Sequence, residues 1–123
     1  MEIADAPSAG RQVIQAYGQG RFRVSSRVSR GSILVYPGQA EPWPVTDAER
    51  ITAQSLDPVS SEAIDILLVG CGASFRPPPR GLAEALKERS MALEWMDTGA
   101  ACRTFNVLMA EERRCAAALI AVD

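Results

Sequence analysis

The chain has 123 residues, of which 47% are hydrophobic and 23% are charged, and its formal net charge is −2. These values are typical of one globular domain, and the negative balance disfavours nucleic acid as a partner. Histidine is absent, which excludes Ser–His and Cys–His nucleophile pairs within the chain and removes the commonest metal ligand. The three cysteines have no CxxC spacing, so we expect reduced thiols, an intracellular location, no metal and no cofactor.

The beginning of the chain is expected to be a flexible arm, residues 1–11, followed by one α/β domain at residues 12–123. Pro7, Ser8 and Gly10 occur within this arm, and no long apolar run accompanies them. We therefore expect neither a secretory signal nor a mitochondrial presequence. No stretch approaches the roughly 20 apolar residues that a membrane span needs.

The N-terminal part of the domain is predicted to be an antiparallel meander. Residues 13–17, 22–24 and 32–36 have strand patterns, and Gly18–Gly20 and Ser29–Gly31 are turn signals between them. Four arginines are expected on the exposed face of this meander, at Arg21, Arg23, Arg27 and Arg30. Two interpretations remain open for them: a solvated charged face, or a docking patch for an acidic partner.

The segment after the meander, residues 41–61, has a weaker secondary-structure pattern. The prolines in 41–45 exclude a central strand, because proline lacks the N–H that a sheet ladder needs, so an extended edge is expected, with Trp43 covering the core. Residues 55–61 fit a short helix, because Ser55 can cap it and Pro58 falls in its first turn.

The remaining half of the chain alternates apolar strands with helices. Strands are predicted at 64–69, 92–96 and 115–122, and helices at 80–90 and 98–112. Nearly continuous apolar runs are typical of parallel strands that are covered on both faces. With two right-handed crossovers, the order gives a parallel βαβαβ unit. The expected fold is α/β and three-layered, with a mixed sheet.

Sites in parallel sheets form beyond the carboxyl ends of the strands, where two loops are expected to meet, at 70–79 and 97–106. Gly70-Cys71-Gly72 is neither a dinucleotide fingerprint nor a P-loop, because Phe75 replaces the third glycine and no Gly-Lys follows. The glycines either allow a tight turn beside a neighbouring backbone or, with Arg76 and a helix N-terminus, form an anion cradle.

Thr98, Cys102 and Asn106 are spaced by four and form one row on the second helix, and Arg113 follows further along the same side. Asp97 or Thr98 can cap this helix, and Asn106 can hydrogen-bond and lock a neighbouring loop. In the alternative interpretation, Asp97, Cys102 and Asn106 form the polar wall of a pocket. Cys102 is then either a reactive thiol near the helix N-terminus or a small buried hydrophobe.

Several motifs resemble a family of uncharacterised domains that includes the mitochondrial NADH dehydrogenase (complex I) assembly factor 3. The similarity covers residues 12–122 and is carried by Tyr17–Val24, Gly31–Val35, Trp43, Gly70–Gly72, Glu94–Thr98, Ala101–Leu108, Glu112–Arg114 and Ala116–Ile120. The resemblance implies a three-layer α/β fold with a mixed sheet, no established enzymatic activity, and a role in assembly through protein contacts. The chain departs from the family pattern at Glu111-Glu112, where Glu-Gly is more usual. Because no mitochondrial presequence is expected, the resemblance implies a bacterial, cytoplasmic relative, with peripheral contact to the inner membrane as an option.

Two function classes follow. The first is a non-enzymatic interaction or assembly protein related to complex I assembly, with protein partners. The second is a small-molecule-binding protein or enzyme that uses a pocket between loops 70–79 and 97–106. Its candidate residues are Gly70, Cys71, Gly72, Arg76, Asp97, Thr98, Cys102, Asn106 and Arg113.

Overall fold

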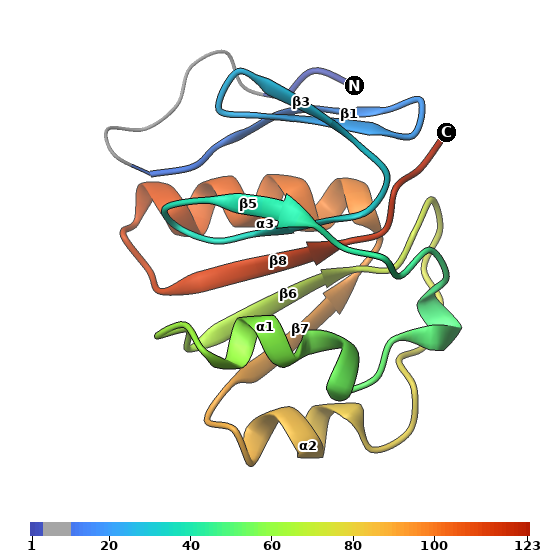
Figure 1. Ribbon diagram of the computed structural model, residues 1–123, viewed down its shortest axis with the longest axis vertical. Helices are drawn as coiled ribbons and strands as arrows, with labels where there is room; N and C mark the ends of the chain where they lie inside the picture. Colours follow the sequence, from blue (N-terminus) through green and yellow to red (C-terminus); the bar gives the residue numbers. More distant parts are fainter. Residues whose placement is uncertain (4–10) are drawn as a thin grey trace.

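The computed structural model describes residues 1–3 and 11–123. Its strands form two sheets, one in the order β1-β2-β3 and one in the order β5-β4-β8-β6-β7 (Figure 1). The first contains β1 (Ile14–Gly18), β2 (Arg21–Val24) and β3 (Arg27–Arg30). The second contains β4 (Ile33–Val35), β5 (Ala40–Pro42), β6 (Ile66–Gly70), β7 (Ala92–Met96) and β8 (Cys115–Leu119). The helices are η1 (Ala48–Arg50), η2 (Gln54–Leu56), α1 (Asp57–Ser60), α2 (Leu82–Lys87) and α3 (Thr98–Ala110).

The five-stranded sheet separates two hydrophobic cores. Successive strand residues point to opposite faces, so Leu67 and Val69 of β6 enter one core while Leu68 between them enters the other. The first core is covered by α1 and α2, and the second by α3 and the three-stranded sheet (Figure 1). Helices therefore cover both faces of the larger sheet, which gives the expected three layers, and β1–β3 pack beside α3 against the second core.

The predicted fold class is confirmed. Strand β6 pairs in parallel with β7 on one side and with β8 on the other, whereas β4 and β5 are antiparallel additions beyond β8. The residues of β8 are buried throughout, as a central strand requires. The prediction for 92–96 matches β7, and the short helix expected at 55–61 corresponds to η2 and α1.

Two features of the N-terminal part differ from the expectation. A turn was expected at 29–31, but strand β3 lies at 27–30. The chain turns earlier, because Ser25 and Ser26 form a two-residue turn with positive φ angles of 47° and 71°. The strand at 33–35 pairs with β8 and β5 in the larger sheet, so the meander consists of β1, β2 and β3. Trp43 is buried as expected, and its indole N–H donates to Ser55 O over 2.9 Å.

Helix α2 is shorter than the predicted 80–90. Its N-cap Gly81 has a φ of +83°, in the left-handed region, so residue 80 lies in a preceding turn and the helix begins at Leu82. Helix α3 begins at Thr98 as predicted, and ends at Ala110 instead of Glu112, whose φ is +58°.

The arm predicted at 1–11 falls mainly on residues 4–10, which lie outside the described part. The first three residues run beside β1: Ile3 N–H donates to Gln15 O over 2.8 Å, and Tyr17 N–H donates to Met1 O over 3.0 Å. Within residues 1–3 and 11–123, no helix is both long and apolar enough to cross a membrane.

Candidate functional site

Thr98 joins the two loops that the sequence places at the carboxyl ends of β6 and β7. Its hydroxyl donates to Ile120 O over 2.8 Å and accepts from Gly72 N–H over 3.0 Å. Its own N–H donates to Gly72 O over 2.9 Å. The side chain is fully buried, so these bonds form away from water. Thr98 thereby fixes the start of α3 against both the Gly70–Gly72 turn and the residue after β8.

Gly70 allows this close packing. A Cβ added at Gly70 would lie 2.8 Å from Thr98 Cα and 3.0 Å from Leu119 Cδ2. A separation below 3.0 Å is shorter than packed carbon atoms adopt, so any side chain at Gly70 would push α3 away. Gly72 has open space around its Cα but a φ of +123°, which favours glycine. The prediction that these glycines serve a tight turn beside a neighbouring backbone is confirmed by this geometry.

A cleft of about 330 Å³ lies beside the Gly70–Gly72 turn. Three of the predicted residues line it, Cys71, Gly72 and Arg76. The other side comes from a segment that the sequence did not connect with the site, Thr46–Ala48, and from Ile120. The Arg76 guanidinium lies 3.3 Å from the Glu49 carboxylate in an exposed ion pair. The segments 46–48 and 71–76 are distant in the sequence and meet at this cleft only in the folded chain.

Asp97 and Cys102 occupy structural positions. The Asp97 carboxylate accepts from Ala100 N–H over 2.9 Å and is therefore the N-cap of α3. The Cys102 side chain is fully buried in the core beneath α3. Burial raises the pKa of the Cys102 thiol to about 12, against the smaller lowering by the positive charge of Arg103. The thiol is protonated at neutral pH, which is opposite to what a nucleophilic cysteine requires.

Asn106 connects α3 to β1. Its side-chain amide donates to Ile14 O, and its side-chain oxygen accepts from Ile14 N–H, each over 2.8 Å. The expectation of a neighbouring loop as the partner is wrong, because Asn106 holds the backbone of a strand 92 residues away in sequence. The amide therefore attaches the three-stranded sheet to α3, and it does not line the cleft beside Gly72.

Arg113 lies apart from the other candidate residues. It lines a second cleft of about 420 Å³ together with Ile66, Glu94 and Leu108. Its backbone oxygen accepts a hydrogen bond from the Arg11 guanidinium over 2.5 Å. The candidate residues therefore divide between the carboxyl ends of the strands, the core beneath α3, the β1 backbone and this second cleft.

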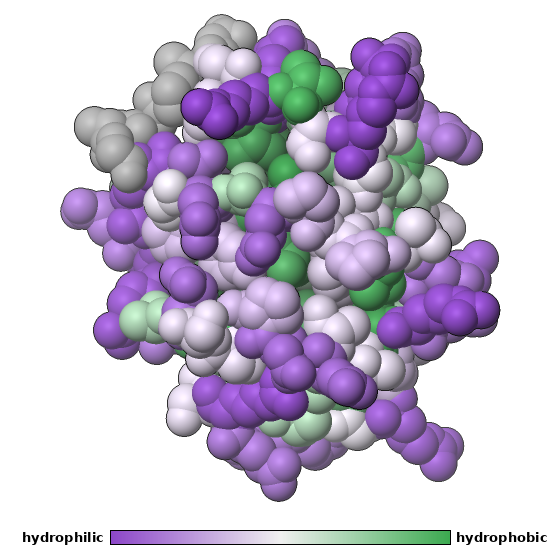
Figure 2. Space-filling model, in the orientation of Figure 1, coloured by the Kyte–Doolittle hydropathy of each residue, from purple (hydrophilic) through white to green (hydrophobic). Residues whose placement is uncertain are grey.

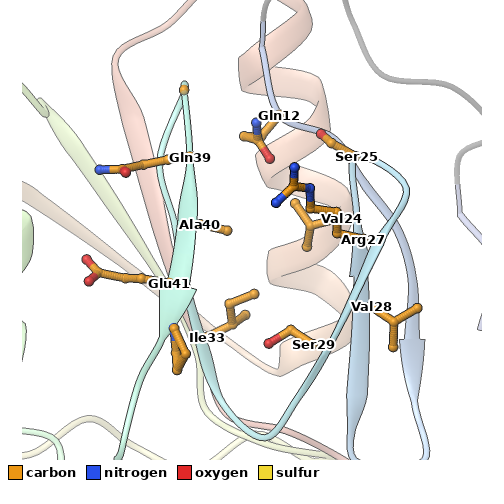
Figure 3. A pocket seen from close by; sticks show the side chains of 12 residues that line it. Gln12, Val24, Ser25, Arg27, Val28, Ser29, Ile33, Gln39, Ala40 and Glu41 are labelled. Atoms are coloured by element: carbon orange, nitrogen blue, oxygen red, sulfur yellow. The ribbon is translucent and has the colours of Figure 1, made fainter.

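A larger groove of about 540 Å³ separates β3 from β5 (Figure 3). Val24 and Ile33 come from the two sheets and form its apolar interior, while Arg27 and Ser29 extend from β3 toward it. Ala40 points into the groove from β5, and Glu41 points to the opposite side of that strand. The groove depends on the packing of two sheets, so no local motif in the sequence indicated it.

No group of three or more Cys, Asp or Glu side chains in the described ranges, 1–3 and 11–123, converges in a way that could hold a metal ion. The profile of the family described as "Protein of unknown function (DUF498/DUF598)" matches residues 14–120. The chain belongs to this family. The predicted resemblance is therefore confirmed over nearly the whole domain.

Relatives within the DUF498/DUF598 family include both uncharacterised and named proteins. An uncharacterised protein of Rhodobacter capsulatus is 38% identical over 91% of this chain and 86% of its own length. The NADH dehydrogenase [ubiquinone] 1 alpha subcomplex assembly factor 3 of Danio rerio is 36% identical over 98% of this chain and 70% of its own length. The Drosophila melanogaster protein of the same name is 35% identical over 88% of this chain, which spans only 58% of that protein.

Solved structures show the same DUF498/DUF598 fold. A crystal structure titled as an outer membrane protein from Bartonella henselae has a TM-score of 0.85 at 39% identity and covers 97% of this chain and all of that one. The Rpa2829 protein from Rhodopseudomonas palustris has a TM-score of 0.79 at 43% identity, with 99% and 90% coverage. The structure titled MT938, at 17% identity and a TM-score of 0.67 over 91% of this chain and 99% of that one, shares the fold alone.

Proposed function

We propose that this chain is a non-enzymatic interaction protein that helps to assemble the respiratory NADH dehydrogenase. One observation carries the proposal: relatives named as assembly factors for this enzyme align with 88–98% of the chain. The aligned part is the two-sheet domain itself, so the domain is what this chain shares with the assembly factors. The chain would act in the cytoplasm and contact the membrane enzyme peripherally.

The use of polar groups around α3 supports this proposal. Asp97 caps the helix, Thr98 joins two loops, and Asn106 holds the β1 backbone. Each of these groups is already engaged in holding backbone segments together. Such contacts stabilise a rigid domain whose surfaces are then free to bind a protein partner.

The experiment is removal of the gene from the cell that carries it, followed by native electrophoresis of the membranes. We expect less fully assembled NADH dehydrogenase, with an unchanged turnover for each assembled enzyme. Cross-linking of the tagged chain at its native level should capture subunits of that enzyme, with the tag alone as the control. Normal assembly in the deletion strain, together with no cross-linked subunit, would overturn the proposal.

A second candidate function is small-molecule binding in the 330 Å³ cleft. Its motivation is the position of the cleft at the carboxyl ends of parallel strands, where Arg76 offers a cation to an anionic ligand. A ligand held there should raise the melting temperature of the native chain, and Arg76→Ala should remove this shift. Equal shifts for both proteins would exclude the cleft as the ligand site.

A further inference from the structure

Strand β3 has an unpaired side among the described residues, because it is the last strand of the three-stranded sheet. Gly31 N–H donates to Gly20 O over 2.8 Å, and β2 and β3 are joined by the two-residue turn at Ser25–Ser26. Hydrogen-bonded and non-hydrogen-bonded pairs alternate in an antiparallel ladder. The N–H and C=O groups of Val28 and Arg30 therefore point away from β2, toward the open edge.

The side chains of β3 alternate between two environments. Arg27 and Ser29 are opposite Val24 and Phe22 and extend on the groove side of the sheet (Figure 3). Val28 lies on the other face, where 64% of it is exposed. A strand added beside β3 would follow the same alternation, with one set of side chains entering the groove and the other on the outer face.

The outer face of this sheet carries more basic than acidic side chains. The register places Arg21, Arg23 and Arg30 on this face, and Arg23 forms an ion pair with Glu2. Arg21 is directly opposite Arg30 in the register of β2 and β3, and like charges in that position destabilise a sheet. No ion pair involves either of them within residues 1–3 and 11–123. Hydrophilic side chains surround an apolar one over this sheet, at the top of Figure 2.

Other strand edges near the groove are less open than that of β3. The outer side of β1 is occupied by residues 1–3 through the backbone bonds described above. On β5, the groups that point outward belong to Ala40 and Pro42, since Trp43 N–H donates to Ser32 O and Tyr36 N–H donates to Gln39 O. Proline has no N–H, so β5 can donate only at Ala40. β3 offers N–H and C=O groups at two positions.

We propose that β3 and the groove beside it bind an extended acidic segment of a partner protein, which adds to the three-stranded sheet as a fourth strand. Apolar side chains of that segment enter the groove toward Ile33 and Ala40, and acidic side chains alternate with them and meet Arg21 and Arg30. Backbone bonds to an exposed sheet edge give such a complex its affinity, while alternate side chains give it specificity. The inference rests on the proposed function only in taking the partner to be a protein.

The test uses the whole chain, labelled with 15N, and a capped peptide of four Glu-Val repeats as the probe. We expect chemical-shift changes at Ile33 and Ala40, and slower hydrogen exchange at the amides of Val28 and Arg30. The control peptide has the same composition, with all glutamates in one block and all valines in the other. Because its alternation is broken, it should leave the Val28 and Arg30 amides unprotected.

Charge reversal gives a second, independent measurement. The double variant Arg21→Glu and Arg30→Glu should bind the alternating peptide about tenfold more weakly, because two attractive rim charges become repulsive. Arg80→Glu is the matched control, since Arg80 is an exposed arginine outside both sheets, and should bind like the native chain. If the double variant does not fold, the exchange measurement on the native chain decides the question.

Each remaining outcome overturns the inference. Equal binding of the two peptides would show a basic surface without strand pairing. The same amide protection at high protein concentration without peptide would make a second copy of this chain the occupant. No binding of either peptide, combined with cross-linking of NADH dehydrogenase subunits to another surface, would refute this docking site while leaving the proposed function intact.

Discussion

Asn106 forms two hydrogen bonds with the backbone of Ile14, one donated by its side-chain amide and one accepted by its side-chain oxygen, each 2.8 Å long. The two residues are 92 positions apart in the sequence. One comes from the middle of α3 and the other from the first residue of β1. The Asn106 side chain therefore makes the two hydrogen bonds that a neighbouring strand would make with Ile14, and it attaches the three-stranded sheet to α3.

Replacing Asn106 by alanine should destabilise the domain by about 1–3 kcal/mol, because both backbone groups of Ile14 lose their partner. Chemical denaturation monitored by tryptophan fluorescence measures this change. Val107→Ala is the matched control, because Val107 is on the same helix with 56% of its surface exposed, and it should have a small effect. Equal denaturation midpoints for the native chain and Asn106→Ala would contradict the prediction.

Much of the architecture could be predicted from local sequence pattern, and the parts that could not depend on distant pairing. The apolar run at 64–69 and the Ala-rich run at 115–122 correctly indicated buried parallel strands. The placement of β8 between β4 and β6 has no local signal, because any buried strand satisfies the same pattern. Strand β3 was missed because the turn before it uses Ser25 and Ser26 instead of the Asn-Gly or Gly residues that usually mark a hairpin.

The candidate site shows the same division. The cap at Asp97 was predictable, since a carboxylate before a helical pattern is a local arrangement. The sequence allowed Cys102 to be either a reactive or a buried thiol. In the fold, Cys102 packs into the core against the sheet and is fully buried. The Asn106 partner and the groove beside β3 were not predictable, because each joins segments that approach only in the folded chain.

Thr98→Val should destabilise the domain by about 1–3 kcal/mol, because the change removes the hydroxyl but keeps the shape of the side chain. Gly72 N–H and Ile120 O would each lose a bond to Thr98. Thr98→Ser is the matched control: it keeps the hydroxyl and loses a methyl group, so it should be the more stable of the two variants. Urea denaturation at neutral pH measures both. A valine variant at least as stable as the serine variant would show that the hydroxyl adds nothing.

Gly70→Ala should cost about 1–3 kcal/mol, because the added methyl group meets the backbone of Thr98, which cannot rotate away. Gly38→Ala provides the comparison, since a Cβ at Gly38 has nothing within 4 Å and its φ is not in the left-handed region. That change should be neutral or slightly stabilising. Thermal unfolding of the two variants beside the native chain checks the difference, and similar melting temperatures for both would refute the packing argument.

The buried thiols should make the domain less stable in alkaline solution. The pKa values of Cys102 and Cys115 are raised by burial from 9.0 to about 12 and about 11 in the folded chain. Below pH 9 both thiols are protonated in the folded and unfolded states, so their full contribution to stability is present. Above pH 9 the unfolded chain loses these protons first, and the free energy of unfolding falls as pH rises, by at most ~1.4 kcal/mol per pH unit for each thiol.

Urea denaturation at pH 8, 9 and 10 measures this slope, and Cys102→Ala should make it shallower because one of the two shifted thiols is gone. Met109→Ala is the control: Met109 is buried in the same core beneath α3 and has no titrating group, so its removal lowers stability equally at each pH. Burial also predicts that a thiol reagent at pH 8 labels Cys102 far more slowly in the folded chain than in urea. Parallel pH curves for the native chain and Cys102→Ala, or fast labelling of the folded protein, would mean that the thiol is not held protonated in the core.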